Sequence, residues 1–230
     1  LLLISVSRKS WKPILVGALV VCNVAVYWGM FSARQEMLLR VTFLDVGQGD
    51  AAFIEFPGGK TMLIDGGPKT FSFDAGERTV VPFLRYRGVE NIDYLVLSHP
   101  DGDHLGGLPA ILRAIPAGTV VEGNTQGRSA LYAQFKAIAE SLSVPRRSSF
   151  AGDLIGDGLP ARIYVLAPEP EQAGDADNMN ERSLVLMVRY GGTSVLFPGD
   201  AEDGAEARMV SRYGTFLDSD ILKAGHHGSK

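Results

Sequence analysis

Residues 98–104 read Ser98-His99-Pro100-Asp101-Gly102-Asp103-His104, and this stretch is the most informative one for the fold and the site. It follows the apolar run 94–98, which predicts a buried strand. Pro100 and Gly102 favour a tight loop, so two imidazoles and two carboxylates are expected at one end of a sheet. Without a cation, such a group would repel and desolvate badly. A solvated acidic turn with incidental histidines is the alternative.

A second histidine group follows another predicted strand. Residues 221–225 lead into His226-His227-Gly228-Ser229, so all four histidines of the chain lie in two loops. Two further predicted strands, 61–65 and 193–197, lead into Asp65 and Asp200. A single Asp at a strand end is usually part of a turn. Four polar strand endings in one chain predict a shared rim.

The composition limits the chemistry of that rim. The chain has 230 residues, 46% hydrophobic and 21% charged, with a net charge of −4 and one cysteine. This length corresponds to one or two domains, and the apolar content excludes a disordered chain. One cysteine excludes a disulfide framework, a cysteine-based zinc finger and an iron–sulfur cluster held by this chain alone. Any metal must therefore be bound by histidine and carboxylate.

An uncharged segment near the N-terminus predicts a membrane span at about 13–33, within a segment that covers 1–36. A signal peptide and a buried core helix are the alternatives. The apolar run ends in Tyr27-Trp28-Gly29-Met30-Phe31, which is typical of a membrane interface and not of a cleavage site. We expect a transmembrane α-helix followed by one domain, 37–230.

The charged flanks predict the orientation of the span. Arg8, Lys9 and Lys12 precede it, whereas Arg34 and Arg40 follow it, which places the N-terminal side in the cytoplasm and the domain outside. Residues 1–36 carry a net charge of +3, which leaves −7 for the remainder. An acidic domain binds polyanions poorly, so phosphate chemistry would need a local site or metal ions. The basic residues nearest the motifs are Arg182, Lys223 and Lys230, and ordinary surface charge explains them equally well.

Residues 37–230 alternate predicted strands and helices without repeats. Strands are expected at 38–46, 51–56, 61–65, 94–98, 162–166, 184–190, 193–197 and 221–224, and helices at 79–86, 105–114, 129–142 and 202–212. Antiparallel strands come first, and mixed strands and helices follow. This order favours an α/β fold of layered sheets with helices outside.

One glycine motif suggests a different site. Gly47-Gln48-Gly49-Asp50-Ala51-Ala52 matches the form of a dinucleotide-binding fingerprint. That site requires a helix directly after the glycines, because the helix N-terminus binds the pyrophosphate. Here a strand and a Pro-Gly-Gly turn follow, which argues against a dinucleotide site.

In chain order, four motifs resemble the metallo-β-lactamase superfamily: Asp65-Gly66-Gly67, His99-Pro100-Asp101-Gly102-Asp103-His104, Phe197-Pro198-Gly199-Asp200 and His226-His227-Gly228-Ser229. The motif Asp45-Val46-Gly47-Gln48-Gly49-Asp50 is, more narrowly, similar to the hydrolase domain of ComEC-type competence proteins, the membrane channels of bacterial DNA uptake. The resemblance covers about Val41 to Lys230. It implies a four-layer αββα sandwich. That fold normally continues after its last histidine, so we expect a C-terminally truncated fragment of reduced stability.

The resemblance also implies a ligand set. One metal position would be held by Asp103, His104 and His226, with Asp200 as a bridging carboxylate, and His99 and Asp101 would face a second position. Whether His226 or His227 is the ligand stays open. Asp103 and Asp200 are the residues implied to be catalytic.

Two departures from the superfamily pattern weaken the position that His99 faces. Asp101 stands where the superfamily usually has histidine, and Asn180 stands where it has a further histidine ligand. The oxygen-rich set is compatible with Zn²⁺ or Mn²⁺, as one or two ions. The residues expected to support the ligands or to contact substrate are Asp45, Gln48, Asp50, Asp65, Asn180, Ser183 and His227.

The resemblance implies a metal-dependent phosphodiesterase or nuclease that hydrolyses DNA outside the cytoplasmic (inner) membrane during natural transformation. Its expected partners are DNA, the membrane, the channel portion of the same full-length protein and other competence proteins. Two alternatives stay open: a non-catalytic module that docks or gates DNA, and an envelope phosphodiesterase that acts on choline-phosphate esters. Antibiotic hydrolysis does not follow, because a fold does not determine a function.

Overall fold

The structure is a computed structural model that describes residues 11–36, 38–123, 127, 129–170 and 178–228. The chain divides into two compact units, Leu1–Leu38 and Leu39–Lys230. The first contains helix α1 (Trp11–Glu36), and its stretch Trp11–Met30 is long and apolar enough to cross a membrane. Inside α1, the amide of Asn23 donates a 2.8 Å hydrogen bond to the carbonyl of Leu19, so this polar group is satisfied within the helix.

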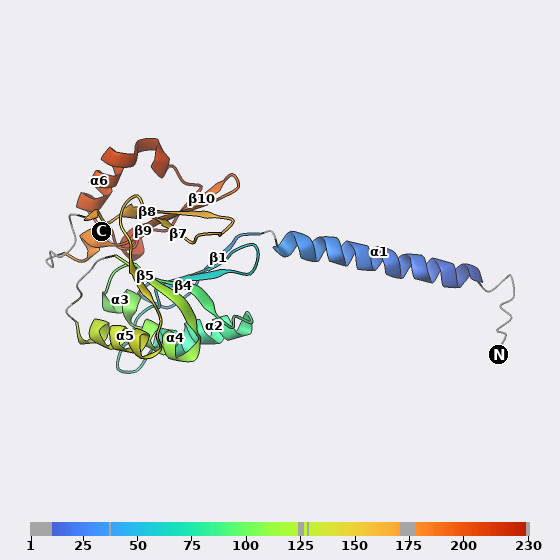
Figure 1. The fold of residues 1–230 in the computed structure, drawn as a ribbon, viewed down its shortest axis with the longest axis horizontal. Helices are drawn as coiled ribbons and strands as arrows, with labels where there is room; N and C mark the ends of the chain where they lie inside the picture. Colours follow the sequence, from blue (N-terminus) through green and yellow to red (C-terminus); the bar gives the residue numbers. More distant parts are fainter. Residues whose placement is uncertain (1–10, 37, 124–126, 128, 171–177, 229–230) are drawn as a thin grey trace. The chain divides into compact units, whose positions relative to one another are not determined.

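Two sheets form the centre of the second unit (Figure 1). The described strands of the first sheet lie in the order β1 (Arg40–Phe43), β2 (Ala52–Glu55), β3 (Thr61–Ile64), β4 (Ile92–Leu97), β5 (Ala117–Glu122) and β6 (Arg146–Ser148). Those of the second lie in the order β11 (Ile221–Leu222), β10 (Thr193–Phe197), β9 (Val185–Tyr190), β8 (Arg162–Ala167) and β7 (Leu154–Ile155). Strands β1 to β3 pair antiparallel, whereas β3 to β6 pair parallel.

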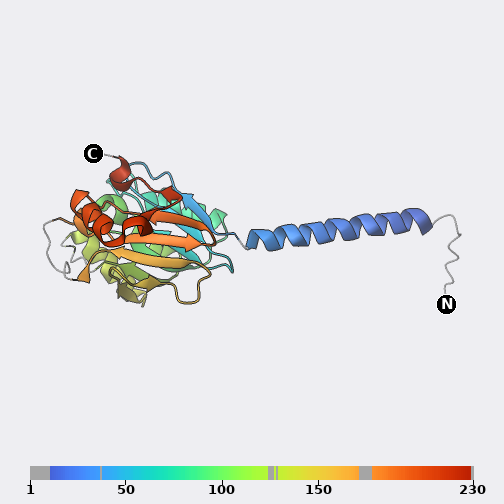
Figure 2. The same cartoon turned by 90° about the horizontal axis from the view of Figure 1, so that it is seen from above.

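Helices cover the outer faces of both sheets. The first sheet is covered by α2 (Val81–Tyr86), α4 (Leu108–Ala114) and α5 (Ala130–Ser141), and the second by α6 (Asp203–Tyr213) (Figure 1). Figure 2, seen from above, shows α6 over the five-stranded sheet. The short elements are η1 (Gly76–Val80), α3 (Gly102–Leu105), η3 (Asn180–Arg182), η4 (Gly214–Leu217) and η5 (Gly225–Gly228). The predicted four-layer αββα sandwich is confirmed.

The alternation of apolar side chains along β4 shows how one strand serves two cores. Leu95 and Leu97 pack toward the helices, whereas Val96 packs between the two sheets, and all three are fully or almost fully buried. Full burial of each such side chain contributes about 1.5–3 kcal/mol. A sheet buried on both faces therefore holds its strand ends rigidly, including the loop at 98–104.

Several elements differ from the sequence-based expectation. Strands β5, β6 and β7 were not predicted: β5 opens on Ala117-Gly118, β6 is a three-residue exposed strand and β7 has two residues. The helix expected at 105–114 is divided into α3 and α4, because Gly106 and Gly107 pack directly on other backbone segments. Most other boundaries agree within two residues.

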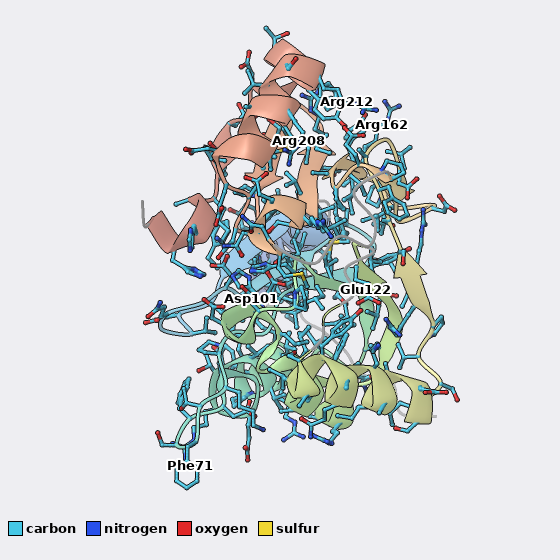
Figure 3. The ribbon with its side chains drawn as sticks, turned by 90° about the vertical axis from the view of Figure 1, so that its left-hand side faces the viewer. Phe71, Asp101, Glu122, Arg162, Arg208 and Arg212 are labelled. Atoms are coloured by element: carbon cyan, nitrogen blue, oxygen red, sulfur yellow. The ribbon has the colours of Figure 1, made fainter. Side chains whose placement is uncertain are left out.

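A buried carboxylate links α5 to the first sheet. The carboxylate of Glu122, at the end of β5, accepts hydrogen bonds from Arg146 on β6 and from the phenol of Tyr132 on α5. Figure 3 shows Glu122 and Asp101 between α6 and α5, in a view from the end of the domain where the parallel strands terminate. This end carries the candidate site.

Candidate metal centre

The strand directions bring distant loops to one edge. Strands β1, β3 and β4 run in the same direction, so the segments after them meet where the first sheet ends. Strand β11 runs parallel to β10, so the segments after these two strands also share an end. The loops that contribute are those containing Asp50, Asp65, His99 to His104, Asp200 and His227.

Four side chains form the candidate metal group among the described residues. Asp50, His104, Asp200 and His227 each offer one ligand atom, and these atoms lie within 4.8 Å of one another. His104 and Asp200 are buried, and Asp50 and His227 are half-buried. Two imidazole nitrogens and two carboxylate oxygens form a donor set that suits Zn²⁺ and also accepts Mn²⁺.

Hydrogen bonds determine which nitrogen of His104 is free. Its Nδ1 lies 2.8 Å from Oδ2 of Asp65. A carboxylate only accepts hydrogen bonds, so Nδ1 carries a proton, and Nε2 is the nitrogen that remains for a metal. Asp65 is oriented by the backbone N–H of Ser98, which donates to its Oδ1 at 2.8 Å. The chain therefore presents His104 as a metal ligand is usually held, with its second nitrogen on a carboxylate.

His99 is prepared in the same way through Ser98. The hydroxyl of Ser98 donates to Asp65 at 2.7 Å, and Ser98 Oγ lies 3.1 Å from Nδ1 of His99. Because the one hydroxyl proton points to Asp65, Oγ accepts from His99, and Nε2 of His99 is left with its lone pair. That Nε2 lies 3.7 Å from Asp101 and 4.0 Å from Asp200.

Asp200 stands between the histidines. Its Oδ1 lies 3.3 Å from Nε2 of His104, and its Oδ2 lies 3.6 Å from Nε2 of His227 and 4.0 Å from Nε2 of His99. The backbone N–H of Asp200 donates to Oγ of Ser183 at 3.1 Å, which connects the loop after β10 to the segment before β9. The preceding Gly199 has φ +58, and a Cβ there would lie 2.9 Å from Cβ of Ser183.

Unsatisfied atoms in the centre fit a bound cation. His99 Nε2, His104 Nε2 and Asp200 Oδ1 are among the buried side-chain atoms of the described residues that lack a hydrogen-bond partner. Buried polar atoms are normally paired, and an orphaned group calls for an explanation such as an ion. Since all three atoms are potential metal ligands gathered around Asp200, the residues present fit a divalent metal.

The charged side chains of the group shift one another's pKa values. Burial opposes the charged form of His104, but the carboxylates of Asp65 and Asp200 outweigh it and raise the pKa of His104 to about 10. Burial would raise the pKa of Asp200, but its contacts with His104, His99 and His227 lower it. Burial, together with the neighbouring His104, lowers the pKa of His99. In the metal-free chain the carboxylates are therefore ionised and His104 is protonated. A metal bound at Nε2 would replace one proton of that ring.

The structure distinguishes the adjacent histidines. His227 lies in the group: its ring centroid is 5.2 Å from that of His104, and its Nε2 is 3.1 Å from Oδ2 of Asp103. His226 instead lines a separate cavity of about 380 Å³ with Glu181 and Glu202. Of the two adjacent histidines, between which the sequence left the ligand open, His227 is the one that lies in the four-residue group.

Other predicted residues lie outside the four-residue group. Asp103 contacts His227, and Asp101 is exposed beside His99. Asn180 donates to Glu202 at 2.8 Å and so binds a different side chain. Asp45 and Gln48 are exposed, and Asp45 accepts a hydrogen bond from the N–H of Gly47 at 3.2 Å.

Two basic residues near the motifs are engaged within the chain. Lys223 forms an ion pair with Asp50, and Arg182 is buried. Lys230 lies outside the described residues. The sequence left Lys223 open between a substrate contact and ordinary surface charge, and it gave no role to Ser98. A serine directly before His99, at the end of an apolar strand, was the available signal.

Residues 44–230 match the metallo-beta-lactamase superfamily. The chain belongs to this superfamily. Among its curated relatives, ComE operon protein 3 of Bacillus subtilis is 29% identical across 100% of this chain and 30% of its own length. Competence protein ComA of Neisseria gonorrhoeae is 32% identical, across 87% of this chain and 26% of its own length.

Recombination protein 2 of Haemophilus influenzae is a third relative, 31% identical across 87% of this chain and 23% of its own length. These relatives confirm the predicted resemblance to ComEC-type competence proteins. The chain spans less than a third of their length. Together with the apolar helix α1, they indicate association with a membrane.

Solved structures agree on the fold. A Cronobacter sakazakii metallo-beta-lactamase superposes with a TM-score of 0.53 at 16% identity, covering 80% of this chain and 74% of its own. Metallo-beta-lactamase SMB-1 superposes with a TM-score of 0.51 at 19% identity, covering 83% of this chain and 78% of its own. At these identities the likeness establishes the architecture alone.

Proposed function

We propose that this chain is a metal-dependent phosphodiesterase that hydrolyses DNA at the outer side of a bacterial cytoplasmic membrane during DNA uptake. The observation that carries the proposal is the convergence of three unpaired buried atoms, on His99, His104 and Asp200, in a chain whose relatives include a competence protein. A divalent ion bound there would lower the pKa of a water molecule and stabilise the charge that develops on a phosphodiester.

The surroundings of each site residue support a particular role for it. His104, Asp200 and His227 would hold the ion, and Asp65 orients His104 from behind. The side chain of Asp103 is one-third exposed and lies 3.1 Å from His227, at the mouth of the group, where it can accept a proton. His99 and Asp101 would supply a second, weaker position.

The distribution of charge supports an attraction for DNA at the metal centre. The net charge of −7 on residues 37–230 opposes general binding to a polyanion. Arg208 and Arg212 on α6 are paired with Glu181 and Glu169. We therefore expect metal ions, and not a broad basic surface, to provide the main attraction for phosphate.

The test is DNA cleavage by the purified full chain in detergent, loaded with Mn²⁺ or Zn²⁺. We expect cleavage that stops on metal removal by EDTA, returns on metal addition, and falls at least 100-fold in Asp200→Asn and Asp103→Asn, as is typical of lost metal or proton-transfer residues. Glu169→Gln, on the outer surface, is the matched control and should cleave normally. Stoichiometric metal without cleavage would support a non-catalytic DNA-docking module instead.

One observation favours the second function. The resemblance implies that Asn180 stands where the superfamily has a histidine ligand, and the Asn180 amide donates to Glu202 at 2.8 Å. An incomplete second position is what a docking module would show. Cleavage confined to choline-phosphate esters, measured with the same samples, would assign the site to an envelope substrate.

A further inference from the structure

Two histidines of the metal group are held in matching ways. Nδ1 of His104 lies 2.8 Å from Asp65, and Nδ1 of His227 lies 3.2 Å from Oδ1 of Asp50. Nε2 of His104 lies 3.3 Å from Asp200, and Nε2 of His227 lies 3.6 Å from Asp200 and 3.1 Å from Oδ2 of Asp103. Each of these two histidines thus has a carboxylate beside its Nδ1.

The rear carboxylate of His227 has a partner of its own. Oδ2 of Asp50 forms an ion pair with Nζ of Lys223, and both side chains are mostly buried, at 12% and 15% exposed. Nζ of Lys223 also donates to the carbonyl of Ala224 at 2.9 Å. Asp50 is therefore held between an ammonium on one oxygen and an imidazole on the other.

The backbone around Asp50 is equally constrained. Its N–H donates to the carbonyl of Asp103 at 3.2 Å, and its carbonyl accepts from the N–H of Gly67 at 2.8 Å. The preceding Gly49 has φ +140, and a Cβ there would lie 2.3 Å from the carbonyl oxygen of Asp103. The glycine motif thus lets the loop pack closely against the segment that carries Asp103.

His227 needs such support more than His104 does. The His104 side chain is completely buried, whereas His227 is 17% exposed, has φ +52, and follows a two-residue strand with exposed side chains. His104 is held by complete burial as well as by Asp65, whereas His227 is partly exposed on a short loop. A hydrogen-bonded carboxylate is the usual way to orient such a ring and to set its tautomer.

We propose that Asp50 is a positioning residue that fixes the ring of His227 with the proton on Nδ1 and Nε2 directed to the metal, and that Lys223 holds Asp50 in this role. Asp50 belongs to the four-residue group and could instead be a ligand. The ammonium on Oδ2 argues against that, because Lys223 competes with a cation for the same carboxylate and repels it. The proposal rests on the metal centre of the proposed function and not on its DNA substrate.

Two measurements on the full chain in detergent test the proposal. The first is Zn²⁺ affinity and stoichiometry by titration calorimetry. We expect Asp50→Asn to lower the affinity about 10- to 100-fold with unchanged stoichiometry, as is typical when a carboxylate behind a ligand histidine is lost. Lys223→Met should lower the Zn²⁺ affinity less than Asp50→Asn does, and Lys223→Arg should retain the affinity of the unaltered chain.

The second measurement is ¹⁵N NMR of the histidine rings, with and without Zn²⁺. We expect the hydrogen-bonded Nδ1–H signal of His227 to be lost in Asp50→Asn and retained in Lys223→Arg. A second lysine–aspartate pair, Lys60 and Asp93, lies 2.7 Å apart at the opposite end of β3 and β4 and supplies the matched controls. Lys60→Met and Asp93→Asn should change neither readout.

Two results would overturn the proposal. One is an Asp50→Asn variant with the ring signals and Zn²⁺ affinity of the unaltered chain. The other is a Co²⁺-substituted Asp50→Asn variant whose absorption spectrum shows one ligand fewer with the His227 tautomer intact, which would make Asp50 a ligand. If the unaltered chain binds no metal, the proposed function fails, while the metal-free NMR spectra still decide whether Asp50 positions His227.

Discussion

At the scale of single residues, the carboxylate of Asp65 orients both His104 and Ser98. Asp65 accepts from Nδ1 of His104, from the backbone N–H of Ser98 and from the Ser98 hydroxyl. It is 1% exposed, and although burial would raise the pKa of Asp65, His104 and Ser98 lower it. Asp65 has φ +61, a conformation that costs a non-glycine residue about 1–3 kcal/mol and tends to occur at functional sites.

Asp65→Asn should therefore weaken the metal centre without removing a ligand. The amide cannot serve as acceptor to all three donors, so the tautomer of His104 is no longer enforced. We expect metal affinity to fall about 10- to 100-fold, measured by calorimetry. Asp74→Asn, which alters a buried aspartate paired with Lys69 at 2.8 Å, is the control and should leave the affinity unchanged. Equal affinity in both variants would contradict this role of Asp65.

At the scale of elements, glycines allow the site loops to pack backbone on backbone. A Cβ on Gly107, before α4, would lie 2.1 Å from the carbonyl oxygen of Gly66, after β3. A Cβ on Gly76, at the start of η1, would lie 2.1 Å from the carbonyl oxygen of Gly107. Three segments therefore meet at one point behind the loop that carries His99 and His104.

Gly107→Ala should accordingly destabilise the domain. The added methyl group must displace backbone atoms, which typically costs about 1–3 kcal/mol. Gly102→Ala is the matched control, because a Cβ at Gly102 meets nothing within 4 Å and φ is negative there. We expect urea unfolding, followed by near-ultraviolet circular dichroism of the tyrosines because both tryptophans lie in α1, to show a lower midpoint for Gly107→Ala alone. Equal midpoints would show that the contact relaxes without cost.

At the scale of the whole molecule, the distribution of charge separates two roles. Residues 1–36 carry a net charge of +3 and contain α1, whose apolar stretch Trp11–Met30 could cross a membrane. The acidic remainder holds the metal group. The basic excess before the span predicts that the N-terminal side is cytoplasmic and that the domain lies outside.

Thiol labelling tests this orientation. The chain has one cysteine, Cys22, within the apolar helix, so Cys22→Ser combined with Ser211→Cys places a single thiol on the exposed surface of α6. We expect a membrane-impermeant maleimide to label intact spheroplasts that express this variant. Labelling only after lysis would place the domain in the cytoplasm.

The sequence alone predicted strands buried on both faces, the residue types of the candidate site and the edge of the sheet at which they lie. Continuous apolar runs such as 94–97 favour strands buried on both faces. A polar group directly after a buried strand lies at the end of that strand whatever the rest of the chain does. These are local relations, so one sequence reveals them. Strands β5, β6 and β7 escaped prediction because short or exposed strands are stabilised by their neighbours and not by their own residues.

The contacts between residues within the candidate metal centre became visible in the tertiary structure and not in the sequence. The choice of His227 over His226 depends on the positive φ of both residues and on how β11 lies beside β10. The contact between Asp50 and His227 joins positions 177 residues apart. Such pairings arise from the packing of two sheets, in which each strand end is placed by many side chains at once, and a local pattern contains no record of that packing.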